Sequence, residues 1–213
     1  MINSEIIFFI VLAYLTGALP SSIWIGRLFY NVDVREFGSG NAGATNTFRV
    51  LGYKAGIPVL LIDILKGWIA VKYTLFLSHF LLLDSSNIDV FFETQLVFGI
   101  AAVLGHLFPI YVGFRGGKGI ATMLGILIAI HPPATFYSLV IFCIVLFLFR
   151  YVSLSSIVAS LSFAIIIIIF YNDSVNSLKI FAIFVPILSL ITHQKNIERI
   201  IKGEETKLTF EKK

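Results

Sequence analysis

The sequence predicts an all-α integral membrane protein with about seven transmembrane helices, because it is rich in long apolar segments and poor in charge. Of its 213 residues, 58% are hydrophobic and 13% are charged. A soluble domain averages about 45–50% apolar and about 25% charged residues, so this chain carries too little charge to cover a surface in water. The single cysteine also excludes a disulfide scaffold. We expect residues 1–213 to form one polytopic membrane domain.

The apolar segments are long enough to place most of the spans, since a helix needs roughly 20 residues to cross a bilayer. No basic residue precedes the first segment, so we expect a retained helix rather than a cleaved signal peptide. Pro132 and Pro133 interrupt residues 120–149 and predict a hairpin of two helices. The predicted spans are residues 4–28, 56–80, 96–112, 120–131, 134–149, 154–171 and 178–191. An alternative with five spans treats the hairpin as re-entrant and leaves the orientation unchanged.

The basic residues predict the orientation, because Lys and Arg collect in cytoplasmic loops. With seven alternating helices, one side receives Lys179 alone, beside several carboxylates. The other side receives 13 of the 16 basic residues: Arg27, Arg35, Arg49, Lys54, Arg115, Lys118, Arg150, Lys195, Arg199, Lys202, Lys207, Lys212 and Lys213. We therefore expect the N-terminus outside, the C-terminus in the cytoplasm, and no nucleic-acid partner to explain the net charge of +4.

Three polar stretches lie on the predicted cytoplasmic side and hold most of the small, amide and basic residues. The first stretch is residues 38–49, GSGNAGATNTFR; the second is residues 105–122, GHLFPIYVGFRGGKGIAT; the third is residues 193–205, HQKNIERIIKGEE. Connecting loops rarely repeat one kind of chemistry, so we expect the three stretches to build one shared site.

The residue types in these stretches indicate a site for phosphate groups. Glycines permit positive φ and close approach of the backbone, and successive N–H groups in such turns bind anions. Arg49, Arg115 and Lys118 add full positive charges. His193 and Asn196, at i and i+3, share a helix face if the last helix continues. The candidate binding residues in the first two stretches are Gly38, Gly40, Asn41, Gly43, Thr45, Asn46, Gly116, Gly117 and Gly119. The pattern predicts an enzyme for phosphorylated ligands or lipids, without a metal or a cofactor.

Other motifs fit the sequence less well. The first stretch matches GxGxxG but lacks the strand and βαβ unit of a dinucleotide fold, and the second lacks the first glycine and the Ser or Thr of a P-loop. No nucleotide is expected. His79 and Asp84 match an H-x4-D acyltransferase signature, but they fall at the predicted outer side, so we interpret the match as coincidence.

A few polar residues lie within or beside the predicted spans. Asp63 and Lys66 are spaced i, i+3, and we expect an ion pair at the cytoplasmic end of their helix. His106 begins the second stretch and is a further candidate for the site. Ser153 and Ser156 follow a cytoplasmic turn, where they cap a helix or line the site.

The three stretches resemble the motifs of the bacterial acyl-phosphate:glycerol-3-phosphate acyltransferase family, PlsY. The first is similar to GSGNxGATNxxR, the second to GHxFPxFxxFxGGKGxAT, and the third to HxxNIxRLxxGxE. The resemblance runs from the first helix to the tail, and the second motif is long and highly specific. Arg115, where the family often has Lys, and Ile200, where Leu is usual, are minor departures.

The resemblance implies a fold with seven helices and transfer of a fatty acyl group from acyl phosphate to the 1-hydroxyl of sn-glycerol 3-phosphate. The products are lysophosphatidic acid and phosphate, in the first step of phospholipid synthesis. By motif position, the catalytic and substrate-binding roles pass to Ser39, Arg49, Lys118, His193 and Asn196. The glycine stretches then bind phosphate, and Ser153 or Ser156 belongs to the same site.

A transporter or channel for a phosphorylated solute is the main alternative, because Asp63 and Lys66 with a cation cluster would suit an anion path. Transporters often show internal repeats, however, and no motif occurs twice in this sequence. A scaffold that binds anionic lipid through its basic tail is a third interpretation.

Overall fold

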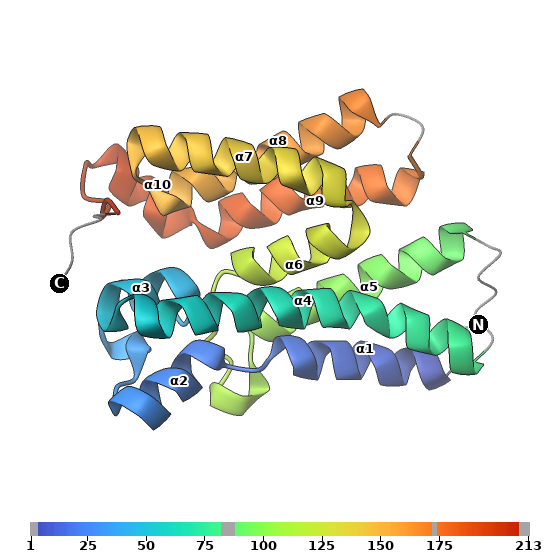
Figure 1. Ribbon diagram of the computed structural model, residues 1–213, viewed down its shortest axis with the longest axis horizontal. Helices are drawn as coiled ribbons and strands as arrows, with labels where there is room; N and C mark the ends of the chain where they lie inside the picture. Colours follow the sequence, from blue (N-terminus) through green and yellow to red (C-terminus); the bar gives the residue numbers. More distant parts are fainter. Residues whose placement is uncertain (1–3, 82–87, 172–173, 209–213) are drawn as a thin grey trace. The chain divides into compact units, whose positions relative to one another are not determined.

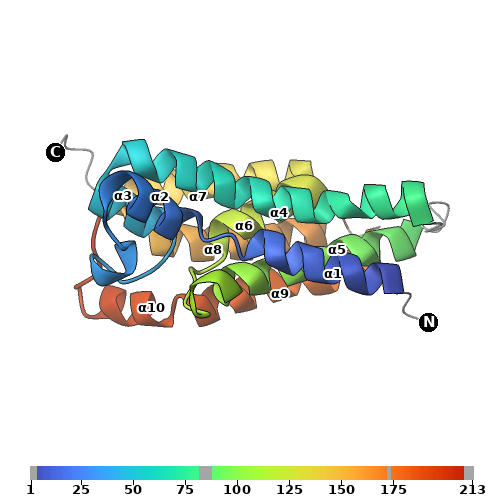
Figure 2. The same cartoon turned by 90° about the horizontal axis from the view of Figure 1, so that it is seen from below.

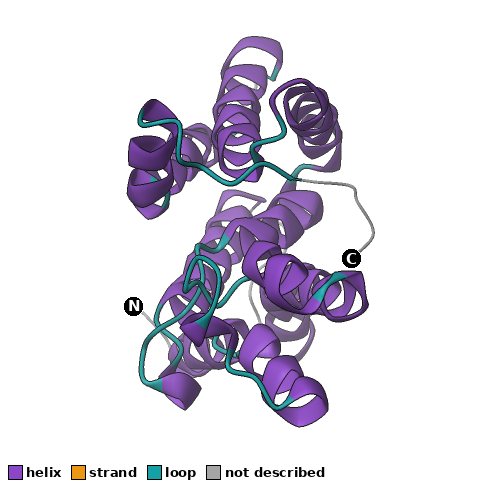
Figure 3. Ribbon diagram, turned by 90° about the vertical axis from the view of Figure 1, so that its left-hand side faces the viewer, coloured by secondary structure: helices purple, strands orange, loops and turns teal. Residues whose placement is uncertain are grey.

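The computed structural model describes residues 4–81, 88–171 and 174–208, and these residues form helices and loops without a strand (Figure 3). An all-α fold was predicted, and this part of the chain confirms it. Asp84, Lys212 and Lys213, used above, lie outside the described residues. The backbone contacts divide the chain into two compact units, Met1–Ile130 and His131–Lys213.

The first unit contains six α-helices and two short 3-10 helices. They are α1 (Ser4–Gly17), α2 (Ser21–Tyr30), η1 (Val34–Glu36), α3 (Ala44–Leu51), α4 (Tyr53–Leu81), α5 (Ile88–Leu107), η2 (Ile110–Val112) and α6 (Ile120–Ile130). Helix α4 packs against α1, α3, α5 and α6, and α1 lies along α5 (Figures 1 and 2). Helix α4 is therefore the central helix of this unit.

The second unit contains four helices: α7 (Pro132–Phe149), α8 (Val152–Phe170), α9 (Asn176–Thr192) and α10 (Gln194–Ile201). Helix α8 packs against both α7 and α9 (Figure 1). The predicted break at the two prolines is confirmed, although α7 already begins at Pro132. Proline suits the first turn of a helix, where its missing N–H costs nothing. The Nδ1 atom of His131 accepts a hydrogen bond from the N–H of Ala134 at 3.2 Å and caps this helix.

The expectation of one helix over residues 4–28 is wrong, and the condition under which His193 and Asn196 share a helix face is not met. Residues 4–28 do not form one helix, because the chain bends by 41° between α1 and α2. Pro20 stands in this break and cannot donate the hydrogen bond that a continuous helix requires. The last apolar helix does not continue through residue 196 either, since α9 and α10 meet at 62° at His193.

Among the described residues, three helical segments are long and apolar enough to cross a membrane by themselves: Asp89–Val112, Pro132–Phe149 and Val152–Phe170. The number rises to five if each of the two bent pairs counts as one span. Helix α4 has 29 residues but carries Asp63, Lys66 and Lys72, and α6 has only 11 residues. The count of seven spans and the orientation of the termini stay predictions.

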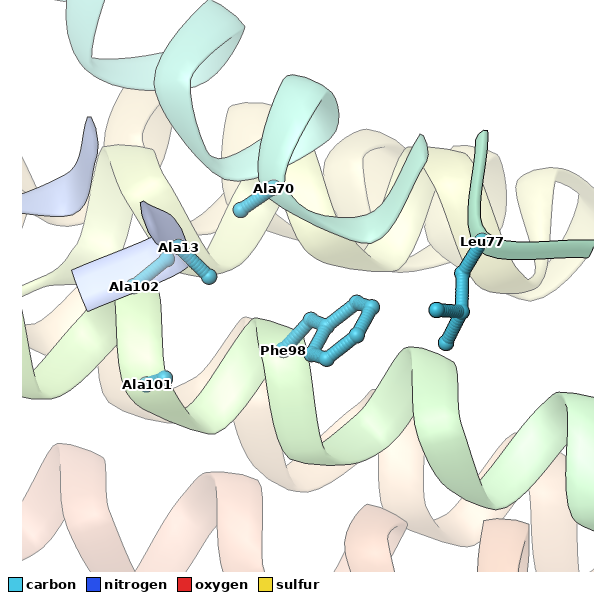
Figure 4. Packing of buried hydrophobic residues seen from close by; sticks show 6 residues of the cluster. All are labelled: Ala13, Ala70, Leu77, Phe98, Ala101 and Ala102. Carbon is cyan, nitrogen blue, oxygen red and sulfur yellow. The ribbon is translucent and has the colours of Figure 1, made fainter. Parts of the chain in front are cut away.

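The core of the first unit is built from small side chains around one aromatic ring. Ala13 of α1, Ala70 of α4 and Ala102 of α5 are fully buried beside Phe98, and Ala101 and Leu77 complete the cluster (Figure 4). Small side chains let helix backbones approach closely, which is how helices associate in a membrane.

Glycines bring α4 and α6 into direct backbone contact. A Cβ atom on Gly125 of α6 would overlap the carbonyl oxygen of Ile64, and one on Gly67 of α4 would overlap that of Thr122. Backbone atoms cannot move aside as a flexible side chain can. The position of α6, and of the second stretch that leads into it, is therefore fixed against α4.

We predict that Gly125→Ala lowers the free energy of unfolding by about 1–3 kcal/mol, because the added methyl group must push α6 away from α4. Thermal unfolding in detergent micelles, followed by circular dichroism, measures the effect. The matched control is Gly99→Ala in α5, where the new Cβ would meet only a side-chain methyl of Ile126 at 3.0 Å. Equal melting temperatures for the two variants would contradict the proposed backbone contact.

Candidate active site

The first stretch is held together by the side chain of Asn46, which is 2% exposed. Its Oδ1 accepts hydrogen bonds from the N–H of Ser39 at 2.8 Å and from the Ser39 hydroxyl at 3.1 Å. Its Nδ2 donates to the carbonyl oxygens of Val34 at 2.7 Å and Phe37 at 3.1 Å. Asn46, predicted as a ligand-binding residue, therefore shapes the loop with all of its polar atoms.

The loop turns into α3 with Ser39 and Arg49 at its surface. Gly38 has φ +63°, which favours glycine, and a Cβ atom there would overlap Asn46 Oδ1. Gly40 has φ +72°, whereas Gly43 is extended at the start of α3. Ser39, Thr45 and Arg49 are exposed, and Asn41 is partly buried. The hydroxyl of Ser39 and the guanidinium group of Arg49 thus lie at the surface of the protein.

The first and second stretches lie next to each other in the first unit. Arg35, just before the first stretch, donates a hydrogen bond from Nη1 to the carbonyl oxygen of Val112 in the second, at 2.9 Å. Val112 also packs against the buried cluster of Ile23, Val34 and Ala42. The predicted convergence is thus present for these two stretches.

The carboxylate of Asp33 fixes Arg35 in this bridging position. Its Oδ1 accepts hydrogen bonds from the N–H of Arg35 at 3.0 Å and from Nε at 3.1 Å, and its Oδ2 accepts from Nη2 at 2.8 Å. Arg27 Nη2 donates to the same Oδ2 at 2.9 Å. The hydrogen bond from the Arg35 side chain, with smaller contributions from its backbone and from Arg27, holds the pKa of Asp33 far below its ordinary value.

The glycines of the second stretch pack against the end of α5. The N–H of Gly116 donates to the carbonyl oxygen of Leu107, and that of Gly117 to the carbonyl oxygen of His106, each at 3.2 Å. Both N–H groups are therefore used within the protein, and the role of these two glycines in binding phosphate stays a prediction. Gly119 has φ +80° and leads into α6. Lys118, between them, is partly buried, and Arg115 is exposed.

The predicted ion pair of Asp63 and Lys66 is confirmed, with 2.9 Å between Lys66 Nζ and Asp63 Oδ1. The two side chains are 1% and 4% exposed. Asp63 Oδ1 also accepts a hydrogen bond from the hydroxyl of Ser21 at 2.7 Å. Lys66 Nζ donates to the carbonyl oxygen of Leu19 at 3.0 Å. The pair on α4 is thus bonded to the break between α1 and α2.

His106 lies between the ion pair and the glycines at residues 116 and 117 of the second stretch. Its Nδ1 is 3.8 Å from Asp63 Oδ1 and 3.1 Å from the hydroxyl of Thr122 in α6. Its ring touches Gly117 so closely that a Cβ atom at residue 117 would overlap Nε2. A small pocket is lined by this histidine, the ion pair and Gly116 and Gly117. His106 was a further candidate, and the structure places its ring against Gly117 of the same stretch.

In the second unit, the third stretch is organised by the carboxylate of Glu205, which is 7% exposed. Oε1 accepts hydrogen bonds from Asn196 Nδ2 at 2.7 Å and from the Ser153 hydroxyl at 3.0 Å. Oε2 accepts from Arg199 Nε at 2.7 Å. Burial alone would raise the pKa of Glu205, but these three hydrogen bonds outweigh it, and the pKa lies below its ordinary value.

His193 lies at the junction of α9 and α10 and is 3% exposed. Its Nδ1 is 2.8 Å from the carbonyl oxygen of Ser189. A carbonyl oxygen only accepts hydrogen bonds, so Nδ1 carries a proton and donates it to this contact. The hydroxyl of Ser156 donates to the carbonyl oxygen of Val152 within α8. Ser153, but not Ser156, is therefore bonded to the third stretch.

Two parts of these sites were missed by the sequence analysis: Glu205, and the pair of Asp33 and Arg35. Glu205 closes the third stretch as its last residue, and that position was the available signal. Asp33 and Arg35 lie outside the first stretch, and nothing in their spacing pointed to a residue nearly eighty positions away. Within the described residues, no group of three or more His, Cys, Asp or Glu side chains is arranged to hold a metal ion.

Comparison with known proteins decides the family. Residues 7–203 match the family described as Glycerol-3-phosphate acyltransferase. This chain belongs to that family. The glycerol-3-phosphate acyltransferases of Staphylococcus saprophyticus and of Staphylococcus aureus strain Newman are each 44% identical to it over 205 residues. Each alignment covers 96% of this chain and 98% of the relative.

Solved structures of the same family agree. A crystal structure of PlsY, an integral membrane glycerol 3-phosphate acyltransferase in its glycerol 3-phosphate form, has a TM-score of 0.83 and 33% identity. The lysophosphatidic acid form has a TM-score of 0.80 and 32% identity. Both matches cover 97% of this chain and 96% of the other. This acyltransferase is a multi-pass membrane protein, and the resemblance in the three stretches is confirmed.

We predict that Glu205→Gln lowers the free energy of unfolding by about 1–3 kcal/mol at neutral pH, because it removes the charge that Arg199 binds. The folded pKa of Glu205 lies below its ordinary value of 4.5. Its stabilisation is therefore fully present above pH 4.5 and is lost as pH falls through the folded pKa. The difference in melting temperature between wild type and variant should shrink across that range. Glu198→Gln, at an exposed position of α10, is the control; the same loss there would contradict the account.

Proposed function

We propose that this protein transfers a fatty acyl group from acyl phosphate to the 1-hydroxyl of sn-glycerol 3-phosphate. The observation that carries the proposal is the family match over nearly the whole chain, joined to solved relatives in glycerol 3-phosphate and lysophosphatidic acid forms. Those two molecules differ by one acyl group on a glycerol hydroxyl. The donor follows from the motif resemblance, and an acyl phosphate supplies an activated carbonyl without a cofactor.

The reaction depends on correctly positioned groups more than on a strong protein base. The bond between the acyl carbon and the phosphate oxygen breaks, and a bond forms between the acyl carbon and the 1-hydroxyl oxygen. The hydroxyl proton leaves, and inorganic phosphate departs with the bonding electron pair. The protein's contribution is then to orient both substrates and to stabilise the oxyanion and the leaving phosphate.

The first unit offers the cations for two phosphate groups. We assign the acyl phosphate to Lys118 and to the first N–H groups of α6, since helix N-termini favour anions. Gly116 and Gly117 hold this loop against α5, because their N–H groups donate hydrogen bonds to carbonyl oxygens of that helix. Arg49, exposed on α3, holds the phosphate of glycerol 3-phosphate, and the Ser39 hydroxyl serves the same substrate.

The motif resemblance also assigns a role in acyl transfer to His193 and Asn196, which lie in the second unit. His193, whose Nδ1 is bonded to the carbonyl oxygen of Ser189, orients the substrate hydroxyl. Asn196 is fixed by Glu205 and orients charged oxygens. The proton itself passes to a substrate phosphate, whose second pKa of about 6 in phosphorylated residues suits it for this task. No strong protein base is then required.

The substrates also favour a site at the membrane surface. An acyl chain stays in the hydrocarbon while its phosphate reacts with a soluble polyanion in water. From the distribution of basic residues, we propose that this surface is the cytoplasmic face of the inner membrane. Both units, residues 1–213, then act as one acyltransferase.

Purified protein in liposomes should release phosphate and form lysophosphatidic acid only when acyl phosphate and glycerol 3-phosphate are both present. Mass spectrometry of the lipid and a colorimetric phosphate assay measure the two products. Acyl-CoA in place of acyl phosphate should give no product. Movement of glycerol 3-phosphate into the vesicles without lipid product would instead support a transporter.

Lys118→Ala should abolish detectable turnover, because it removes the charge that binds the leaving phosphate; such a loss costs about 100-fold or more. His193→Gln should keep measurable turnover, because the substrate phosphate takes the proton. Steady-state rates at saturating substrate compare the two variants, with Lys195→Ala, exposed on α10, as the control. Equal and complete loss in both variants would make His193 the base and contradict the proposal.

A further inference from the structure

The contacts around Asp63 join the break between α1 and α2 to α4, the end of α5 and the start of α6. We call Asp63, Lys66 and His106 the Asp63 cluster. Through Ser21 and Leu19 it binds the start of α2, and through Thr122 it reaches α6. Every member of the cluster is at least nine-tenths buried. The chemistry assigned above requires none of them to touch a substrate.

The cluster is in direct contact with the loop that carries Lys118. The side-chain ring of His106 packs against Gly117. The backbone carbonyl oxygen of His106 accepts a hydrogen bond from the N–H of Gly117. The N–H of Gly116 is bonded one residue further along α5, to Leu107. A rotation or shift of the His106 ring therefore moves the backbone immediately before Lys118.

The charges of the cluster are not explained by stability alone. A buried ion pair is often replaced by apolar side chains with no loss of stability, because desolvation cancels much of the attraction. Unlike an apolar pair, an ion pair forms directional hydrogen bonds. Here these bonds fix the positions of Ser21 and Lys66. Asp63 Oδ2 is buried, and no donor among the described residues reaches it. Asp63 also lines the small pocket beside Gly116 and Gly117.

We propose that the Asp63 cluster positions the loop of residues 116–118 for the acyl phosphate: Asp63 lies beside the His106 ring, with 3.8 Å between Oδ1 and Nδ1, and that ring packs against Gly117. All three are positioning residues, because each acts through the loop and not on the substrate. The inference rests on the proposed function, since it assigns the acyl phosphate to Lys118. It adds that a charge pair on α4 sets the affinity for that substrate.

The test separates stability from positioning with the double variant Asp63→Asn/Lys66→Met. Each single variant leaves one buried charge without its partner and should lower the melting temperature. The double variant removes both charges, so its melting temperature should return close to that of the wild type. The KM for palmitoyl phosphate should nevertheless stay raised by about tenfold or more, since misplacing a binding group by about 1 Å can cost that much.

The kinetic pattern is specific for a displaced binding loop. Loss of binding that is equal in the ground state and the transition state raises KM and leaves kcat unchanged. The KM for glycerol 3-phosphate, assigned to Arg49, should change less than the KM for palmitoyl phosphate. The control is Lys72→Met, on the same helix but over the ring of Trp68, which should leave both KM values as in the wild type. A double variant with native stability and native KM would overturn the proposal.

His106→Asn provides a second test that places no unpaired charge in the interior. It should raise the KM for palmitoyl phosphate to a similar degree. Combined with Asp63→Asn, it should add little to the effect of either change alone, because the two residues act in series. Independent, multiplying effects, or a native KM in His106→Asn, would overturn the inference. A wild-type protein that forms no lysophosphatidic acid would instead refute the proposed function.

Discussion

The buried ion pair of Asp63 and Lys66 is the interaction on which the first unit depends. Two charges in an apolar interior are costly unless each is paired and its remaining hydrogen bonds are filled. Here Ser21 binds the carboxylate and the carbonyl oxygen of Leu19 binds the ammonium group. Both partners lie where α1 gives way to α2 at Pro20. The polar break in the first apolar segment thus binds Asp63 Oδ1 and Lys66 Nζ, while no described donor reaches Asp63 Oδ2. The two charged side chains in turn bind the irregular backbone of the break, as a membrane protein requires.

Close contacts between helix backbones also fix the positions of the loops that follow these helices. Gly67 is the next residue after Lys66, and it brings α4 against the backbone of Thr122 in α6. Gly105 precedes His106 and lies against the carbonyl oxygen of Tyr14 in α1. The side chains that hold the second stretch are therefore set on helices whose spacing is fixed by backbone contact. Preorganisation of this kind lets a loop bind a phosphate without first being ordered by it.

Much of this could be predicted from the sequence, and the failures have physical reasons. The apolar segments predicted the bounds of α4, α7 and α8 closely. The residue types also predicted the ion pair between Asp63 and Lys66. Helix α3 was missed because it has only eight residues, and its start follows Gly43 without a side-chain cap. The glycines of residues 116 and 117 suggested anion binding, yet their N–H groups bind α5. Glycines in a sequence indicate that the backbone can approach another group closely. Only the structure shows which group that is. The bonds of Glu205 to Ser153 and of Arg35 to Val112 were missed because these partners are distant in sequence.

The central claim is that a phosphorylated acyl donor binds at the loop that α5 and the Asp63 cluster support. The most direct measurement is an experimental structure of this protein with a non-hydrolysable acyl phosphonate. The account predicts the phosphonate group within about 4 Å of Lys118 Nζ, the range of an ion pair, at the N-terminus of α6. A phosphonate bound away from Lys118 while the protein remains an active acyltransferase would contradict it.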